Sequence, residues 1–133
     1  MSTAVDVVRL SLHVGAATVW VGGQVVVGAL VGPLRRAAPE AVAVLTRGFA
    51  RVGWPAFAVL LLTGGWNLAV APHQSSGYQT TLGIKMVLVV LSGLAAFLHT
   101  RASAPAGKAV WGALGLLAAV GAMVAGVTLT EIG

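Results

Sequence analysis

The chain has 133 residues, of which 58% are hydrophobic and 8% are charged, and it contains no cysteine. Soluble domains average roughly 45–50% apolar and 25% charged residues, so this composition excludes an ordinary soluble protein and predicts an integral membrane protein in a lipid bilayer. The formal charge of +5 comes from basic residues scattered at the ends of hydrophobic runs, a distribution that argues against nucleic acid as a partner. Without cysteine, a metal would need histidine, methionine, carboxylate or macrocycle ligands.

Four apolar runs are each near the roughly 20 residues that a helix needs to cross a bilayer. We expect spans over residues 7–31, 52–71, 82–98 and 109–130. The first run is too long for the hydrophobic region of a cleaved signal peptide, so we expect it to be a true span. The predicted fold class is all-α, with residues 1–133 forming one domain, an integral-membrane antiparallel four-helix bundle.

The segments between the runs are rich in glycine, proline and charge, as is typical of loops. We expect connections at residues 32–47, 72–77 and 100–108. Residues 37–50 could instead form a short interfacial helix, or an extension of the second span, because apolar residues recur there at helical spacing.

Basic residues are concentrated in the first and third connections and at their edges: Arg35, Arg36, Arg47, Arg51, Arg101 and Lys108. By the positive-inside rule these two connections face the cytoplasm. Both termini and the connection that contains His73 are then outside, with Arg9 as a minor counterweight. We expect a multi-pass protein of a bacterial-type plasma (inner) membrane.

Glycine accounts for 18 residues, most of them within the spans, and residues 28–32 form a GxxxG motif. Small residues let membrane helices approach closely. Close packing or a homodimer interface explains most of these glycines, and the remainder could leave room for a flat ligand.

His13 and Lys85 lie inside hydrophobic runs, where an ionisable side chain is expensive and indicates a functional site. On the predicted topology both residues lie toward the outer face, so we expect them to belong to one site. At about 100° per residue, His13 shares a helix face with Trp20 and Gln24. We expect this face, and the polar face of the third span that contains Lys85, to point into the bundle.

Lys85 shares a face of the third span with Ser92 and His99, and the second span adds Thr63 and Asn67 near its outer end. His99 lies about 21 Å along the axis from Lys85, so the three histidines do not form one compact metal site. Structural roles stay open: Lys85 could reach the headgroups, and a membrane histidine is often satisfied by a neighbouring polar group.

Residues 12–23, LHVGAATVWVGG, resemble the first membrane helix of the copper-resistance D (CopD) membrane-domain family, which has a histidine, a few small residues and then Trp-x-Gly-Gly. Residues 49–51 and 60–64 resemble its next helix. Residues 77–89, GYQTTLGIKMVLV, resemble the Tyr-x-x-x-Leu-x-x-Lys region that opens a later helix.

The histidine on the first span and the lysine on the third also resemble HemJ, the four-helix haem-associated protoporphyrinogen oxidase family. This resemblance implies haem b near the outer face, with His13 as an axial ligand and a redox or electron-transfer role. The second ligand would be His73, His99 or a group of a partner subunit, and Lys85 or Arg51 would meet the propionates. The expected cofactor-binding residues are His13, Lys85, Trp20, Asn67 and His99, and the expected metal ligands are His13, His73 and His99.

Two other functions stay open. The resemblance to CopD implies copper binding or transport, for which Met86, adjacent to Lys85, could share a site with His13, although copper(I) prefers cysteine and methionine. The other is a structural membrane subunit without a cofactor. Asp6, Glu40 and Glu131 are not spaced as a catalytic carboxylate pair, so unaided acid/base catalysis is the least favoured function, while a haem-dependent oxidoreductase stays open. We expect a homo-oligomer or a membrane redox partner.

Overall fold

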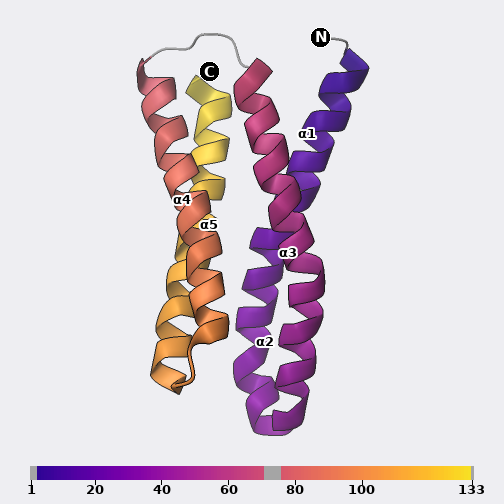
Figure 1. The fold of residues 1–133 in the computed structure, drawn as a ribbon, viewed down its shortest axis with the longest axis vertical. Coiled ribbons are helices and arrows are strands. Elements are labelled where there is room, and N and C mark those ends of the chain that lie inside the picture. The colour runs from indigo at the N-terminus through magenta and orange to yellow at the C-terminus, as the bar shows by residue number, and fades with distance from the viewer. Residues whose placement is uncertain (1–2, 71–75, 133) are drawn as a thin grey trace. The chain divides into compact units, whose positions relative to one another are not determined.

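The computed structural model describes residues 3–70 and 76–132, which are almost entirely helical (Figure 1). The elements in chain order are α1 (Thr3–Ala17), the π-helical turn η1 (Thr18–Gly22), α2 (Gly23–Ala37), α3 (Pro39–Val70), α4 (Ser76–Arg101) and α5 (Pro105–Ile132). Since α1, η1 and α2 are continuous, the described residues contain four helices long and apolar enough to cross a membrane: Thr3–Ala37, Pro39–Ala69, Ser76–Arg101 and Pro105–Glu131. The predicted all-α class and the multi-pass membrane assignment are confirmed.

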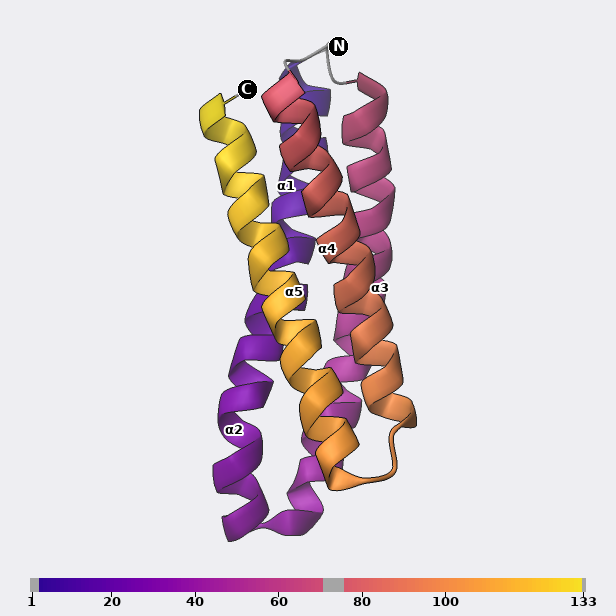
Figure 2. The ribbon, with the colours of Figure 1, turned by 90° about the vertical axis from the view of Figure 1, so that its left-hand side faces the viewer.

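The helices pack in two compact units, Met1–Ala71 and Pro72–Gly133. In unit 1, α3 runs antiparallel to the continuous helix and contacts all three of its parts, α1, η1 and α2. In unit 2, α4 and α5 form an antiparallel pair (Figure 2). Each unit is therefore a helical hairpin, and the single four-helix domain expected from the sequence stays a prediction.

The connection predicted at residues 32–47 is wrong, because only Ala38 leaves the helical conformation, with φ −154° and ψ 75°. The Ala38 amide donates to the Leu34 carbonyl and the Ala38 carbonyl accepts from Ala41, so the turn keeps its backbone bonds. Pro39 then occupies the first position of α3, where its missing N–H costs nothing. Of the two alternatives for residues 37–50, the extension of the second span is confirmed.

The third connection is also shorter than predicted. Helix α4 begins at Ser76 and ends at Arg101, and α5 begins at Pro105, so the predicted loop at 100–108 shrinks to residues 102–104. Residues 71–75, which include His73, lie outside the described part of the chain. The helices exceed the predicted spans because polar residues end an apolar run without ending a helix.

The centre of unit 1 is an aromatic cluster of Trp20, Phe49, Trp54 and Phe57. Trp20 is 3% exposed, and its ring centroid lies 4.6 Å from that of Phe57 and 5.2 Å from that of Trp54. The Phe49 ring lies over two glycines: a Cβ at Gly53 would be 3.0 Å from Phe49 Cζ, and a Cβ at Gly23 would overlap the ring. The missing side chains at these glycines let α2 and α3 approach around Phe49.

Small residues also bring α4 and α5 of unit 2 together. A Cβ at Gly115 would lie 3.4 Å from Ala95 Cβ and 3.6 Å from the Ser92 carbonyl. Ser92, which is 1% exposed, donates its hydroxyl proton to the Val89 carbonyl at 2.7 Å. Its polarity is thus satisfied within its own helix, as the membrane requires.

Candidate functional site

His13 of α1 forms a hydrogen bond across unit 1 to Thr63 of α3, with 2.7 Å between Nδ1 and Oγ1. Thr63 Oγ1 also lies 2.7 Å from the Val59 carbonyl and 3.3 Å from the Leu60 carbonyl. A hydroxyl has one proton and a carbonyl can only accept, so in the tautomer with the ring proton on Nδ1, Thr63 accepts from His13 and donates to its own helix. In the neutral ring the lone pair then lies on Nε2.

This arrangement is the usual one for a histidine that binds a metal, since the hydrogen bond of one ring nitrogen fixes the tautomer and orients the other. Thr63 is 4% exposed, so its own-helix bond is protected from competing water. A Cβ at Gly64 would lie 3.9 Å from His13 Cε1, so glycine at this position leaves space beside the imidazole.

A buried arginine lies one turn from His13 on the same face of α1. The Arg9 side chain is 11% exposed, and its Nη1 lies 3.0 Å from Asp6 Oδ1. The Arg9 guanidinium carbon is 5.9 Å from the centroid of the Trp66 ring on α3. An ionisable residue within an apolar helix is rare and commonly marks a functional site. The sequence interpretation treated Arg9 only as a counterweight in the orientation and missed it as a candidate.

Six residues toward the N-terminal end of α1 and the C-terminal end of α3 thus define one polar seam: Asp6, Arg9, His13, Thr63, Trp66 and Asn67. Asn67 lies one turn from Thr63, and its Oδ1 is buried with no hydrogen-bond partner among the described residues. Thr63 and Asn67, which the sequence placed together near the outer end of the second span, therefore lie on α3, the helix that contacts His13. The spacing Asp6, Arg9, His13, at intervals of three and four, could have revealed the α1 side of the seam.

Trp20 and Gln24, the other residues on the predicted face of His13, have structural partners. Trp20 is in the aromatic cluster, and Gln24 Nε2 donates to the Trp20 carbonyl at 3.1 Å. The π-helical turn at residues 18–22 interrupts the regular i→i+4 hydrogen bonds of the helix backbone. The Gln24 side chain supplies an additional donor to the Trp20 carbonyl within this turn. A cofactor contact of Trp20 stays a prediction.

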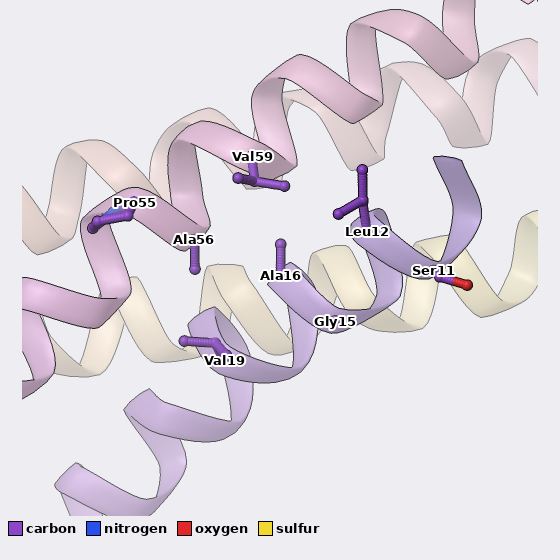
Figure 3. A pocket seen from close by; sticks show the side chains of 8 residues that line it. All are labelled: Ser11, Leu12, Gly15, Ala16, Val19, Pro55, Ala56 and Val59. Carbon is purple, nitrogen blue, oxygen red and sulfur yellow. The ribbon is translucent and has the colours of Figure 1, made fainter. Parts of the chain in front are cut away.

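An open groove of about 320 Å³ follows the same helix pair (Figure 3). Its lining is mostly apolar: Ser11, Leu12, Gly15, Ala16, Val19, Pro55, Ala56 and Val59. The side chains of Ala16 and Ala56 point toward each other across it (Figure 3). The groove lies on the side of α1 next to the His13 face and contains no titratable group, so it offers shape and apolar contact rather than a metal ligand.

Lys85 belongs to unit 2, where its half-buried side chain lies against α5. A Cβ at Gly126 would be 3.6 Å from Lys85 Nζ, so the glycine makes room for the ammonium group. Lys85 and His99 are 14 residues apart on one continuous helix, about 21 Å along its axis, and belong to separate sites. A joint site of Lys85 with His13 stays a prediction.

His99 connects the end of α4 to the first turn of α5 through hydrogen bonds. Its Nδ1 lies 2.7 Å from the Lys108 carbonyl, and Lys108 Nζ donates to the His99 carbonyl at 3.3 Å. The carbonyl can only accept, so His99 Nδ1–H is the donor. This reciprocal pair gives His99 a structural role at the turn, while its role as a cofactor ligand stays a prediction.

Replacing His99 by leucine is expected to lower the free energy of unfolding by about 0.5–1.5 kcal/mol, since the Lys108 carbonyl, which also accepts within its own helix, loses the partly buried bond from His99. Thermal unfolding of the purified protein in detergent, followed by circular dichroism, measures the change. Thr100→Val, which removes an exposed hydroxyl that bonds only the Phe97 carbonyl of its own helix, is the control. Equal stability of the two variants would contradict a stabilising role of the hydrogen bond between His99 and Lys108.

Within residues 3–70 and 76–132, no three histidine, aspartate or glutamate side chains lie close enough together to hold a metal ion, and His73 is outside these ranges. Comparisons with known protein families, with curated proteins and with solved structures find no match for this chain. The resemblance to CopD and HemJ therefore stays a prediction.

Proposed function

We propose that this protein binds haem b through His13, near the outer face of a bacterial-type inner membrane, in a redox or electron-transfer role. The observation that supports the proposal most is the hydrogen bond of His13 Nδ1 to Thr63, since it orients the ring and, in the tautomer that donates from Nδ1, leaves the lone pair on Nε2. Neutral imidazole is the common axial ligand of haem iron. When bound, the haem would supply one-electron redox chemistry, which the protein tunes through the ligand and its hydrogen bond.

The donor set of the polar seam fits this group. His13 provides one imidazole, Arg9 a buried cation, and Asn67 a buried amide. Residues 1–71 contain no other histidine, so a second axial histidine would come from residues 72–133 or from a partner subunit.

The proposed orientation has both termini outside. Arg35 and Arg36 are in the last turn of α2, and Arg47 and Arg51 follow in the first half of α3; all four are exposed. By the positive-inside rule the end of unit 1 where α2 meets α3 is cytoplasmic. The polar seam, at the opposite end of α1 and α3, is then near the outer face.

Titration of the detergent-purified chain with haem b tests the proposal. The wild type is expected to give a Soret band at one haem per chain, and Thr63→Val to bind haem about 10–100-fold more weakly, as second-shell changes at metal sites do. Thr128→Val is the matched control, because the exposed Thr128 hydroxyl also bonds a carbonyl of its own helix, at 2.8 Å, and contacts no histidine in the described residues. A wild type without a Soret band after haem addition would refute the proposal.

A further inference from the structure

We propose that Lys85 binds the phosphate of an anionic phospholipid at the contact between α4 and α5. The ligand is a phosphodiester whose lipid carries a net negative charge, as phosphatidylglycerol does. This inference goes beyond the proposed function and does not depend on haem, because every residue that forms the site belongs to unit 2.

Lys85 has no protein counter-charge in the described part of the chain, where its Nζ makes neither a hydrogen bond nor an ion pair. The chain contains three carboxylate side chains. Asp6 is in an ion pair within α1, and Glu40 is in the first turn of α3. Glu131 is five residues from Gly126 and so about 140° around α5 from the Lys85 contact. A cation within an apolar span is costly, and an anionic ligand supplies the charge that the protein does not.

Gly126 of α5 leaves space for the Lys85 ammonium group between the two helices. A Cβ at this glycine would lie 3.6 Å from Lys85 Nζ and 3.7 Å from Cε, so a longer side chain would occupy the place of the ammonium group. The Lys85 side chain is only half-buried. The cation therefore lies beside the glycine and stays accessible to a ligand.

The ammonium group lies near the depth of phospholipid phosphates. Gly126, which gives the height of Nζ, is six residues before the end of α5 at Ile132, about 9 Å along the axis. A helix of 28 residues is about 42 Å long, so it extends roughly 6 Å beyond each side of a centred hydrocarbon layer about 30 Å thick. Nζ is then about 3 Å inside the edge of that layer, within reach of the headgroups.

Membrane orientation does not explain a lysine at this place. The other basic residues of unit 2 are Arg101, which ends α4, and Lys108 in the first turns of α5. Both lie at the α4–α5 turn, whereas Lys85 lies toward the opposite end of the helix pair (Figure 2). Lys85 is thus separate from the charges that the positive-inside rule accounts for.

Apolar side chains beside the cation suit the acyl chains of a lipid. Ile84, adjacent to Lys85, and Val127, adjacent to Gly126, are both more than half exposed. A phospholipid can place its phosphate at the ammonium group and its chains along these side chains. A soluble phosphate would use the cation alone, so the arrangement favours the lipid.

Amine acetylation of the wild-type chain in detergent tests the inference without a substitution. The chain contains two lysines, Lys85 and Lys108, so peptide mass spectrometry can measure the rate at one against the other. Phosphatidylglycerol is expected to slow the acetylation of Lys85 about tenfold relative to Lys108, as a charge-assisted hydrogen bond does. Phosphatidylcholine, whose choline neutralises the phosphate, should have a much smaller effect. Equal rate ratios in the two lipids would overturn the inference.

Two competitors identify the source of the anion. Glycerol 3-phosphate carries the phosphate without acyl chains and should not protect Lys85, and protection by it overturns the assignment to a lipid. Protection by haem b but not by phosphatidylglycerol would assign Lys85 to the propionates and also overturn it. A wild type without a Soret band refutes the proposed function alone, because the lipid comparison contains no haem.

Variants test the residues, with native mass spectrometry measuring the affinity for phosphatidylglycerol relative to phosphatidylcholine. Lys85→Gln should lower this preference about tenfold, and Lys85→Arg should keep it, because a guanidinium also binds phosphate. Gly126→Leu keeps the charge but fills the space, so it should weaken binding. The matched control is Gly83→Leu, since no atom lies within 4 Å of a Cβ there.

Arg101→Gln removes an exposed charge at the other end of unit 2 and should leave the preference unchanged. A preference retained in folded Lys85→Gln overturns the inference. If Lys85→Gln fails to fold, the acetylation of the wild type decides.

Discussion

His13→Ala is expected to abolish the Soret band of the haem-loaded protein. Loss of an axial ligand removes the bond that holds the iron, so the effect should exceed the roughly 10–100-fold cost of second-shell changes. The fold should persist, because Thr63 keeps its hydrogen bond to the Val59 carbonyl at 2.7 Å. Circular dichroism and size-exclusion chromatography check the fold, and absorbance titration measures haem binding.

Added imidazole provides the sharpest control for this variant. If His13 supplies the ligand, free imidazole should enter the space beside Gly64 and restore the Soret band of His13→Ala. Thr18→Val, at an exposed residue whose hydroxyl bonds the Val14 carbonyl of its own helix, should behave like the wild type. An unchanged spectrum in His13→Ala would show that another residue is the ligand. A colourless wild type that binds copper and loses it in His13→Ala would favour the copper function instead.

Gly23→Ala is expected to lower the free energy of unfolding by about 1–3 kcal/mol, the usual cost of overpacking. The new methyl group would overlap the Phe49 ring, and a Cβ would lie 2.9 Å even from the ring atom Cδ1. Relief requires the Phe49 ring to shift from its place over Gly53, where an added Cβ would lie 3.0–3.2 Å from three ring atoms. Thermal unfolding in detergent measures the loss.

Gly48→Ala is the matched control, because no atom lies within 4 Å of a Cβ at that glycine. Alanine is the better helix former by up to about 1 kcal/mol, so this variant should be as stable as the wild type or more so. Phe49→Leu combined with Gly23→Ala should lose less than the two single changes together, because the smaller side chain leaves room for the methyl group. Additive losses would show that Gly23 and Phe49 do not interact.

The helices could be predicted from the sequence, but their ends could not. Apolar runs near 20 residues mark the part of a helix that is in hydrocarbon, and the four runs correspond to the four long helices. Beyond the hydrocarbon, helix formation depends on capping and packing rather than on hydropathy. Residues 39–50 are helical because their apolar positions, such as Phe49, pack on α2, and Pro33 lies inside α2 without ending it.

The candidate site was predicted in part. The cost of an ionisable group in a span singled out His13, and helical spacing placed Thr63 and Asn67 on one face of α3. The pairing of His13 with Thr63 links residues 50 positions apart, which no local pattern reveals. Arg9 was overlooked because a basic residue near a helix end usually indicates orientation, and only its burial between α1 and α3 distinguishes it from such residues.

The division of the chain into two hairpins has a consequence for biosynthesis. Every residue of the polar seam, from Asp6 to Asn67, belongs to Met1–Ala71. The chain is synthesised from its N-terminus at roughly 5–20 residues per second, and N-terminal units generally fold first. The contacts of the seam can therefore form while α4 and α5 are still being made. A ligand that binds there can therefore meet a complete first hairpin before the second one enters the membrane.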